Sequence, residues 1–511
     1  MHHATTAPAI SYYDYIIVGG GTAGCPLAAT LSQTASVLLL ERGGSPYGNP
    51  NITDLAAFGK ALFDLSSSSP SQRFISEDGV INARARVLGG GSCLNAGFYS
   101  RAASQYVRAA RWDVRLVNES YRWVEKVVAF EPPMKQWQAA AVGGEGWVVG
   151  GRRGPVQRIH GLTVMLHASV HKILFRIKGR NRPLAQGVVF RDASGKKHRA
   201  YLKSGPKNEI IVSSGALGSP QLLMLSGVGP SSHLKAHNIT VVLDQPWVGQ
   251  GMSDNPMNAV FVPSPHTVEV SLIQVVGITQ FGSYIEAASG EPFVSNPAQK
   301  DYFGMFSPKI GQLSTVPPKQ RTPEALEQAI KAMEALDPAV IRGGFILEKI
   351  SGPFSTGHLE LRTKNPNDNP SVTFNYFKDP RDVQRCVDGL KVIETVIESK
   401  AFSEFRYDYL QLSVLLNMTA NAPINLLPKH ANDTTSLEQF CKDTVMTIWH
   451  YHGGCQVGKV VDSEYRVLGV DGLRVIDGST FNYSPGTNPQ ATVMMLGRYM
   501  GVKILQERLQ K

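Results

Sequence analysis

One stretch near the N-terminus, residues 13–41, limits the possible folds more than any other part of the chain. It starts with a short apolar run, YIIV, at residues 15–18, which is typical of a parallel strand covered on both faces. The sequence GGGTAG follows, then small residues of helical character at 25–31, then a second apolar run at 36–40 that ends at Glu41. This order predicts a strand–loop–helix–strand unit in a parallel sheet.

The loop of this unit has the G-x-G-x-x-G pattern of a dinucleotide-binding turn. Its first glycines permit a tight turn and let backbone N–H groups approach a pyrophosphate at the helix N-terminus. The last glycine lets helix and strand pack closely, and the terminal acid can accept hydrogen bonds from ribose hydroxyls. A glycine-rich surface turn would leave the position of that acid unexplained. The predicted contacts are Gly19, Gly21, Thr22, Gly24 and Glu41.

The C-terminal region indicates which dinucleotide is bound. A strand is predicted at residues 473–478, ending in Asp-Gly, and a loop rich in proline and glycine follows at 484–489. An apolar helix is predicted from about residue 490 to 509. A strand and helix that return to the N-terminal unit from the far end of the chain suit a long cofactor, which favours FAD over NAD.

The sequence WHYHGGC at residues 449–455 contains candidate chemistry of several kinds. His450 and His452 could bind a metal together with Cys455, although no second ligand cluster stands out elsewhere. The cysteine could be a nucleophile with a histidine as its base, although no acyl-transfer motif accompanies it. A histidine beside a bound cofactor could instead transfer a proton. A purely structural pair of core histidines is the remaining alternative, and the local sequence leaves all four open.

The bulk composition narrows the class of partner. The chain has 511 residues, which predicts two domains, and a formal net charge of +10 at pH 7. Its basic residues are scattered without interleaved aromatic residues, so we expect no nucleic-acid partner. We expect no transmembrane segment and no signal peptide, because no long apolar run occurs. Six Asn-x-Ser/Thr sequons nevertheless favour the secretory pathway: Asn51, Asn118, Asn238, Asn417, Asn432 and Asn482.

Two long motifs resemble the signatures of a known family. Residues 84–95, RARVLGGGSCLN, resemble the first signature of the glucose–methanol–choline (GMC) flavin oxidoreductases. Residues 215–229, GALGSPQLLMLSGVG, resemble the second at every constrained position. The resemblance extends from about residue 13 to 509 and is closest to the plant branch of HOTHEAD-like proteins and mandelonitrile lyases. It implies an α/β fold (α+β overall), a Rossmann-like FAD-binding domain with an inserted substrate domain on a mostly antiparallel sheet.

The resemblance also implies roles for single residues. The active-site histidine of the family falls on His450 and the second catalytic position on Asn488, so that His452 would point away or brace the loop. We expect non-covalent FAD, because Asn95 and its neighbours include no histidine for a covalent link. We expect no metal. Further cofactor contacts are expected at Arg86, Gly90, Ser92, Asn95, Val170, Asp477, Gly478, Pro489 and Gln490.

The expected domain boundaries follow from the same comparison. Residues 13–255 and 444–511 would form the FAD-binding domain, and residues 256–443, which carry no cofactor signal, would form the substrate domain. The resemblance implies a disulfide between Cys386 and Cys441, the alternative being two reduced core thiols. It also implies a monomer in the secretory pathway or outside the cell.

The implied activity is oxidation of the CH–OH group of a small-molecule alcohol by an FAD-dependent alcohol oxidase or dehydrogenase. The plant branch implies long-chain ω-hydroxy fatty acids in cuticle formation as a substrate class. A hydroxynitrile (mandelonitrile) lyase, which keeps its FAD without redox turnover, is the alternative. Plant lyases carry histidine where this chain has Asn488, which argues against the lyase. A catalytically impaired family member is the third possibility.

The resemblance is interrupted at residues 138–160, QAAAVGGEGWVVGGRRGPVQRIH. Six glycines fall between Gly143 and Gly154, with no apolar period across them. The stretch is also shorter than the corresponding part of the family. We predict that it is irregular and that it reflects a mis-spliced or frame-shifted reading; a genuine flexible loop is the alternative.

Overall fold

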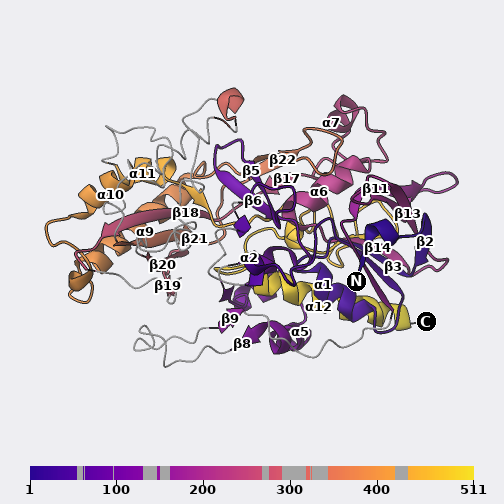
Figure 1. The fold of residues 1–511 in the computed structure, drawn as a ribbon, viewed down its shortest axis with the longest axis horizontal. Coiled ribbons are helices and arrows are strands. Elements are labelled where there is room, and N and C mark those ends of the chain that lie inside the picture. Colours follow the sequence, from indigo (N-terminus) through magenta and orange to yellow (C-terminus); the bar gives the residue numbers. More distant parts are fainter. Residues whose placement is uncertain are drawn as a thin grey trace.

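The computed structural model describes residues 1–53, 61–62, 64–95, 97–130, 147–149, 161–266, 276–290, 318–322, 324, 343–420 and 436–510. Two bodies lie side by side along the long axis of the molecule (Figure 1). Both termini lie on the body at the right of this view.

The first body is built on a parallel sheet. Among the described residues it has six strands, in the order β1 (His2–His3), β10 (Leu162–Leu166), β4 (Val37–Leu40), β3 (Tyr15–Val18), β14 (Glu209–Val212) and β25 (Leu473–Val475). All residues of β3 and β4 are buried, as expected for strands covered on both faces. Ile211 of β14 pairs with both Ile17 and Arg474, so the two ends of the chain meet in one sheet. The predicted Rossmann-like unit is confirmed.

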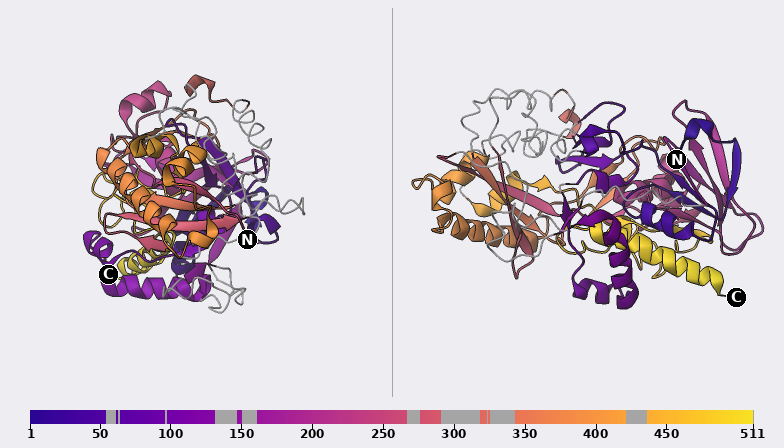
Figure 2. Two further views of the ribbon diagram at one scale, coloured as in Figure 1. Left: turned by 90° about the vertical axis from the view of Figure 1, so that its left-hand side faces the viewer. Right: turned by 60° about the horizontal axis from the view of Figure 1, so that its bottom comes forward.

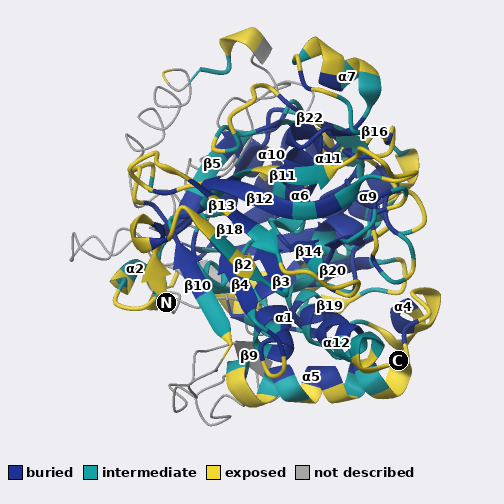
Figure 3. Cartoon of the chain, turned by 90° about the vertical axis from the view of Figure 1, so that its right-hand side faces the viewer, coloured by how far each residue is buried: buried dark blue, intermediate teal, exposed yellow. Residues whose placement is uncertain are grey.

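Three helices pack together beside this sheet: α1 (Gly24–Leu31), α5 (Val114–Val128) and α12 (Gln490–Leu509). Figure 3 shows them next to one another at the foot of the molecule. A Cβ atom on Gly497 would lie 2.2 Å from the Ala23 carbonyl oxygen, so glycine permits the close approach of α12 to α1. Asp113 caps α5 by accepting hydrogen bonds from the backbone N–H groups of Arg115 and Leu116.

A second sheet and several short elements complete this part of the chain. The sheet has the order β11 (Ser169–Arg176), β12 (Leu184–Arg191), β13 (Lys197–Leu202) and β2 (Ile10–Tyr13), and α6 (Gly215–Leu225) packs against β11. The described short helices of this part are α2 (Pro50–Thr53), α4 (Ser104–Ala109) and α7 (Ser231–Ala236), with 3-10 turns at Ala4–Thr6, Gly90–Cys93 and Gly478–Thr480. Two further 3-10 turns, Pro318–Gln320 and Ser403–Phe405, lie between residues 256 and 443. The short strands are β5 (Ser71–Ile75), β6 (Ile81–Ala85), β7 (Phe98–Tyr99), β8 (Ala129–Phe130), β9 (Trp147–Val149), β15 (Val228–Gly229), β16 (Leu243–Asp244), β17 (Gln250–Met252), β22 (Gly357–Glu360) and β23 (Ser371–Thr373).

The second body is an antiparallel sheet covered by helices. Its described strands have the order β19 (Val276–Ile278), β20 (Ser283–Gly290), β21 (Gly343–Ile350), β18 (Pro256–Pro263) and β24 (Met446–Thr447). Its helices are α9 (Pro380–Glu398), α10 (Leu412–Ala420) and α11 (Leu437–Asp443), which lie in front of the sheet in the left view of Figure 2. The predicted antiparallel sheet is confirmed.

The two faces of this sheet have different partners. Val260, Val262 and Ile346 pack in one cluster with residues of α9, α10 and α11. The alternate residues Met257 and Leu347 belong to a separate cluster and line the cavity described below. The expected disulfide is present, and Cys386 and Cys441 join α9 to α11 within the first cluster.

Part of the glycine-rich segment has regular structure. Trp147–Val149 forms β9, which pairs with β7 and β8. The prediction of irregular structure is therefore wrong for these three residues, because strand pairing satisfies their backbone. The remainder of residues 138–160 lies outside the described residues, and the origin of the segment stays a prediction.

Candidate active site

A cavity of about 380 Å³ is lined by both bodies. Its lining extends from Val170 in β11 of the first body to Lys349 in β21 of the second. Thirteen of the sixteen predicted site residues line it: Gly19, Gly21, Thr22, Glu41, Gly90, Asn95, Val170, His450, Asp477, Gly478, Asn488, Pro489 and Gln490. Residues that lie far apart in the sequence therefore meet around one cavity.

The other three predicted residues support this lining from behind. A Cβ atom on Gly24 would lie 2.0 Å from the carbonyl oxygen of Gly19, so only glycine allows the loop to fold against α1. Ser92 donates a hydrogen bond to the Thr22 hydroxyl at 3.0 Å. The Arg86 guanidinium donates to the carbonyl oxygens of Ser66 and Ser69. Cofactor contacts by these residues stay predictions.

Backbone atoms approach one another closely at the first-body end of the cavity. Gly19 has a φ of 102°, and a Cβ atom there would lie 2.3 Å from the carbonyl oxygen of Ser213. A Cβ atom on Gly90 would lie 2.7 Å from the Cα atom of Gly21. The loop before α1 and the loop after β6 therefore face each other as bare backbone. Such a surface fits a phosphate-bearing cofactor, because N–H groups can approach its oxygens.

Two carboxylates hold the turns at this end. Glu41 accepts hydrogen bonds from the N–H groups of Gly20, at 2.9 Å, and Gly43, at 2.7 Å. Burial raises the pKa of Glu41, while these backbone hydrogen bonds act in the opposite direction. Asp477 accepts from the N–H groups of Gly215 and Ser479, and burial raises its pKa as well. The second acid thereby ties the start of α6 to the C-terminal segment.

His450 lies at the other end of the cavity between two amide side chains. Its Nδ1 atom is 3.3 Å from the amide nitrogen of Asn255, and its Nε2 atom is 3.5 Å from that of Asn488. The backbone N–H of His450 donates to Asp254 at 2.9 Å, which fixes the start of the loop. Burial lowers the pKa of His450 well below its usual value, and the charge of Lys349 lowers it further. The imidazole is therefore neutral near pH 7.

Both ring nitrogens of His450 face an amide nitrogen, that of Asn255 on the Nδ1 side and that of Asn488 on the Nε2 side. A neutral imidazole has one N–H donor and one acceptor nitrogen, so only one of the two amides can donate to the ring, and the other must present its oxygen. Nε2 is the acceptor in the tautomer in which the amide oxygen of Asn255 faces Nδ1.

Trp449 and Tyr451 of the WHYHGGC motif line the cavity together with His450, whereas His452 and Cys455 do not. His452 is 2% exposed, its Nδ1 atom lies 3.0 Å from the carbonyl oxygen of His450, and burial lowers its pKa to about 4. Cys455 is fully buried, and burial raises its pKa far above the usual value, so it is no thiolate nucleophile. Among the described residues no His, Cys, Asp and Glu side chains gather as a candidate metal site. His452 therefore braces the loop from which His450 reaches the cavity.

Three site residues were missed by sequence reasoning: Asp254, Asn255 and Lys349. Lys349 lines the cavity and forms a buried ion pair with Glu286, and its ammonium lies 5.7 Å from the centre of the Tyr284 ring. Two adjacent charged residues, Glu348 and Lys349, in a strand that is otherwise apolar were the signal that could have found it. Asp254 and Asn255 stand immediately before an apolar strand, and nothing in the sequence places them beside residue 450.

The chain was compared with known proteins. Family models described as GMC oxidoreductase match residues 153–257 and 353–497. The protein HOTHEAD of Arabidopsis thaliana is 51% identical, over 98% of this chain and 89% of that protein. The chain belongs to the GMC oxidoreductase family. An (R)-mandelonitrile lyase-like protein of the same plant is 43% identical, over 100% of this chain and 92% of that protein.

A solved structure supports the fold. Pyridoxine 4-oxidase from Mesorbium loti superposes with a TM-score of 0.73 at 19% identity, covering 96% of this chain and 98% of that one. Family membership makes this chain an FAD-dependent oxidoreductase, as the sequence predicted. The glycine-lined cavity fits FAD, since it offers bare backbone at one end and a neutral imidazole at the other. No described helix has the length and apolar character needed to cross a membrane.

Proposed function

We propose that this protein oxidises the CH–OH group of an alcohol with FAD as the hydride acceptor. The observation that supports this activity is the neutral His450 imidazole, held between two amides at the edge of the cavity. Bound FAD supplies the electron sink for a hydride from the carbinol carbon. Nε2 of His450 takes the hydroxyl proton, and Asn488 donates a hydrogen bond to the substrate oxygen. The protein thus positions the alcohol and handles its proton.

The cofactor in this proposal is held without a covalent bond. Asn95 lines the cavity, and its amide donates to the backbone carbonyl oxygen of Ser92 and to the amide oxygen of Gln490, neither of which is an imidazole. The purified protein should absorb near 450 nm, and acid precipitation should release all of the yellow colour. Yellow colour that stays in the acid pellet would contradict non-covalent binding. A colourless, folded preparation would contradict FAD binding itself.

The substrate class that we propose is a long-chain ω-hydroxy fatty acid, as for a protein of cuticle formation. Apolar residues of the second body, Met257 and Leu347, line the cavity near Lys349, and they suit a hydrocarbon chain. The test is anaerobic bleaching of the flavin by alcohols of increasing chain length. Faster bleaching by ω-hydroxy fatty acids than by short or aromatic alcohols supports this class. The reverse order would leave alcohol oxidation standing but reject the substrate class.

A hydroxynitrile lyase is the competing activity, because an (R)-mandelonitrile lyase-like relative shares 43% of its residues with this chain. Asn488 favours oxidation, since an amide can donate a hydrogen bond but cannot carry the proton that an imidazole exchanges. Mandelonitrile should therefore release no cyanide. Cyanide release without flavin reduction by any alcohol would reverse the assignment.

Three further properties are proposed alongside this function. We propose a monomer in the secretory pathway, with glycans on exposed sequon residues such as Asn238 and Asn482. A loss of mass on enzymatic deglycosylation of protein from plant tissue checks the location, and light scattering checks the monomer. Sequencing the transcript across residues 138–160 tests whether that segment is mis-spliced. An in-frame transcript that yields fully active enzyme would show that the loop is genuine.

A further inference from the structure

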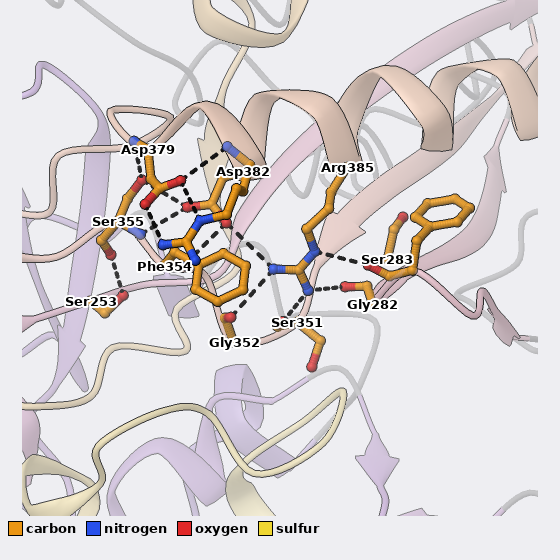
Figure 4. A network of polar contacts seen from close by, with 12 residues as sticks. Ser253, Gly282, Ser283, Ser351, Gly352, Phe354, Ser355, Asp379, Asp382 and Arg385 are labelled. Carbon is orange, nitrogen blue, oxygen red and sulfur yellow. Dashed lines mark hydrogen bonds and ion pairs between the residues drawn. The ribbon is translucent and has the colours of Figure 1, made fainter.

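Arg385 of α9 binds two separate segments of the second body (Figure 4). Its Nε atom donates to the carbonyl oxygen of Phe281 at 3.0 Å, and one terminal nitrogen donates to that of Gly282 at 2.5 Å. The same terminal nitrogen donates to the carbonyl oxygen of Ser351 at 2.6 Å, and the other donates to that of Gly352 at 3.4 Å. One guanidinium therefore holds the start of β20 against the end of β21.

Each of these segments carries a side chain that reaches the loop of Asn488. Ser351 donates from its hydroxyl to the carbonyl oxygen of Gly486 at 2.9 Å. Tyr284, two residues after Gly282, donates from its hydroxyl to the carbonyl oxygen of Thr487 at 2.9 Å. The two carbonyl groups directly before Asn488 are thus fixed from the second body.

Asp382, one turn before Arg385 on α9, binds the segment that follows Gly352. It accepts hydrogen bonds from the N–H groups of Phe354 and Ser355 and from the hydroxyl of Ser355. The carbonyl oxygen of Ser355 accepts from the hydroxyl of Ser253, whose backbone pairs with His452. Figure 4 shows this run of contacts from α9 to Ser253. Residues 351–355 therefore connect the loop of Asn488 with the loop of His450.

We propose that Arg385 and Asp382 are positioning residues that set the separation of His450 and Asn488. Neither side chain is among the residues that line the cavity, so both act through residues 351–355 and through Tyr284. A guanidinium has five N–H donors in a fixed plane, whereas an ammonium cannot reach carbonyl oxygens on both segments in that geometry. The prediction for turnover rests on the proposed function, whereas the prediction for hydrogen exchange does not.

The test compares Arg385→Lys with Arg381→Lys on the same helix. Both guanidinium groups lie over the Phe354 ring, at 5.5 Å and 3.8 Å from its centre, and both substitutions keep the charge. Arg381, however, forms its hydrogen bonds with Asp379 at the exposed start of α9. Arg385→Lys should raise amide hydrogen exchange in residues 483–489 of the flavin-loaded protein about tenfold, and Arg381→Lys should leave that exchange unchanged.

Turnover gives the second readout. A displacement of about 1 Å can lower a rate by about 10²-fold, so Arg385→Lys should lower kcat by 10 to 100-fold with little change in KM. Equal exchange and equal kcat in the two lysine variants would overturn the proposal. Exchange is measured without substrate, so a wild-type protein that oxidises no alcohol would contradict the proposed function and leave the positioning result intact.

Ser351→Ala keeps the test decisive if Arg385→Lys does not fold. It removes the hydrogen bond to Gly486 and leaves Arg385 in place. It should raise exchange in residues 483–489 in the same direction, and Tyr284→Phe should act similarly through Thr487. Wild-type exchange in both of these variants would overturn the proposal.

Discussion

Backbone atoms form the surface at one end of the cavity, and side chains form it at the other. At the first-body end the surface is backbone: Gly19, Gly21 and Gly90 have no side chain, and a Cβ atom on Gly19 or Gly90 would collide with a neighbouring chain. At the other end the surface is made of side chains, with His450 between Asn255 and Asn488. Phosphate binding needs many close N–H groups, whereas proton transfer needs one titratable group in a chosen environment. A defect at the first end should therefore remove the cofactor, and a defect at the second should remove turnover.

The largest effect is expected at the backbone end. Gly24→Ala places a Cβ atom 2.0 Å from the Gly19 carbonyl oxygen, so the loop must move and flavin-loaded protein should not form. The control is Gly277→Ala in β19, where the nearest atom to a new Cβ would be 3.7 Å away. Flavin content per protein is measured by absorbance. Full flavin content in the Gly24 variant would show that backbone packing does not decide cofactor binding.

The next effect is expected at the side-chain end. His450→Gln should lower the rate of flavin reduction by about 10²–10⁴-fold, because it removes the proton acceptor, while flavin stays bound. His452→Gln should have a smaller effect, since that ring bonds only to the carbonyl oxygen of His450 among its side-chain contacts in the described structure. Stopped-flow reduction of both variants measures the difference. Loss of flavin reduction in the His452 variant, with reduction retained in the His450 variant, would show that His452 is the proton acceptor.

A shift in pH dependence is expected from Lys349. Its charge is one of the causes, after burial, that lower the pKa of His450. A proton acceptor must be neutral, so activity is present above this pKa and is lost as pH falls through it. Lys349→Met should move the acidic limb of kcat/KM to higher pH. The double variant Lys349→Met/Glu286→Gln removes both charges of the ion pair, so it should shift the acidic limb less than Lys349→Met alone. The same acidic limb in the wild type and both variants would exclude this electrostatic effect.

The smallest effect is expected at Glu348, which neighbours Lys349 in β21 and points to the opposite face of the sheet. Burial raises the pKa of Glu348 to about 8, so the folded protein favours the protonated form. Because the carboxyl group binds its proton more tightly in the folded state, protonated Glu348 adds to the free energy of unfolding. This stabilisation is fully present below the unfolded pKa of about 4.5 and is lost as pH rises through about 8. Glu348→Gln should therefore flatten the fall of Tm between about pH 5 and about pH 9. An unchanged slope would show that another group causes the decline.

The two ends also differ in how far the sequence predicted them. Residues 13–41 specify strand, turn, helix and acid within one short stretch, and the structure places β3, α1 and β4 there. His450 and Asn488 were assigned by resemblance, and they line one cavity. Asn255 was missed because its partner is 195 residues away, and contacts between distant segments, such as the pairing of Ser253 with His452, bring the two together.

The sequence by itself determined the elements whose signals are local. Glycine spacing and apolar runs act within a few residues, so they predicted the Rossmann-like unit and α12, whereas the antiparallel sheet of the second body was implied by the family resemblance. Only the tertiary structure decided the chemistry of the reaction end. The burial of His450, the charge of Lys349 and the contacts of Arg385 with residues 281–282 and 351–352 join segments that are separated along the chain. A pKa or a fixed distance between two loops depends on the whole environment in space, and no short stretch of sequence contains it.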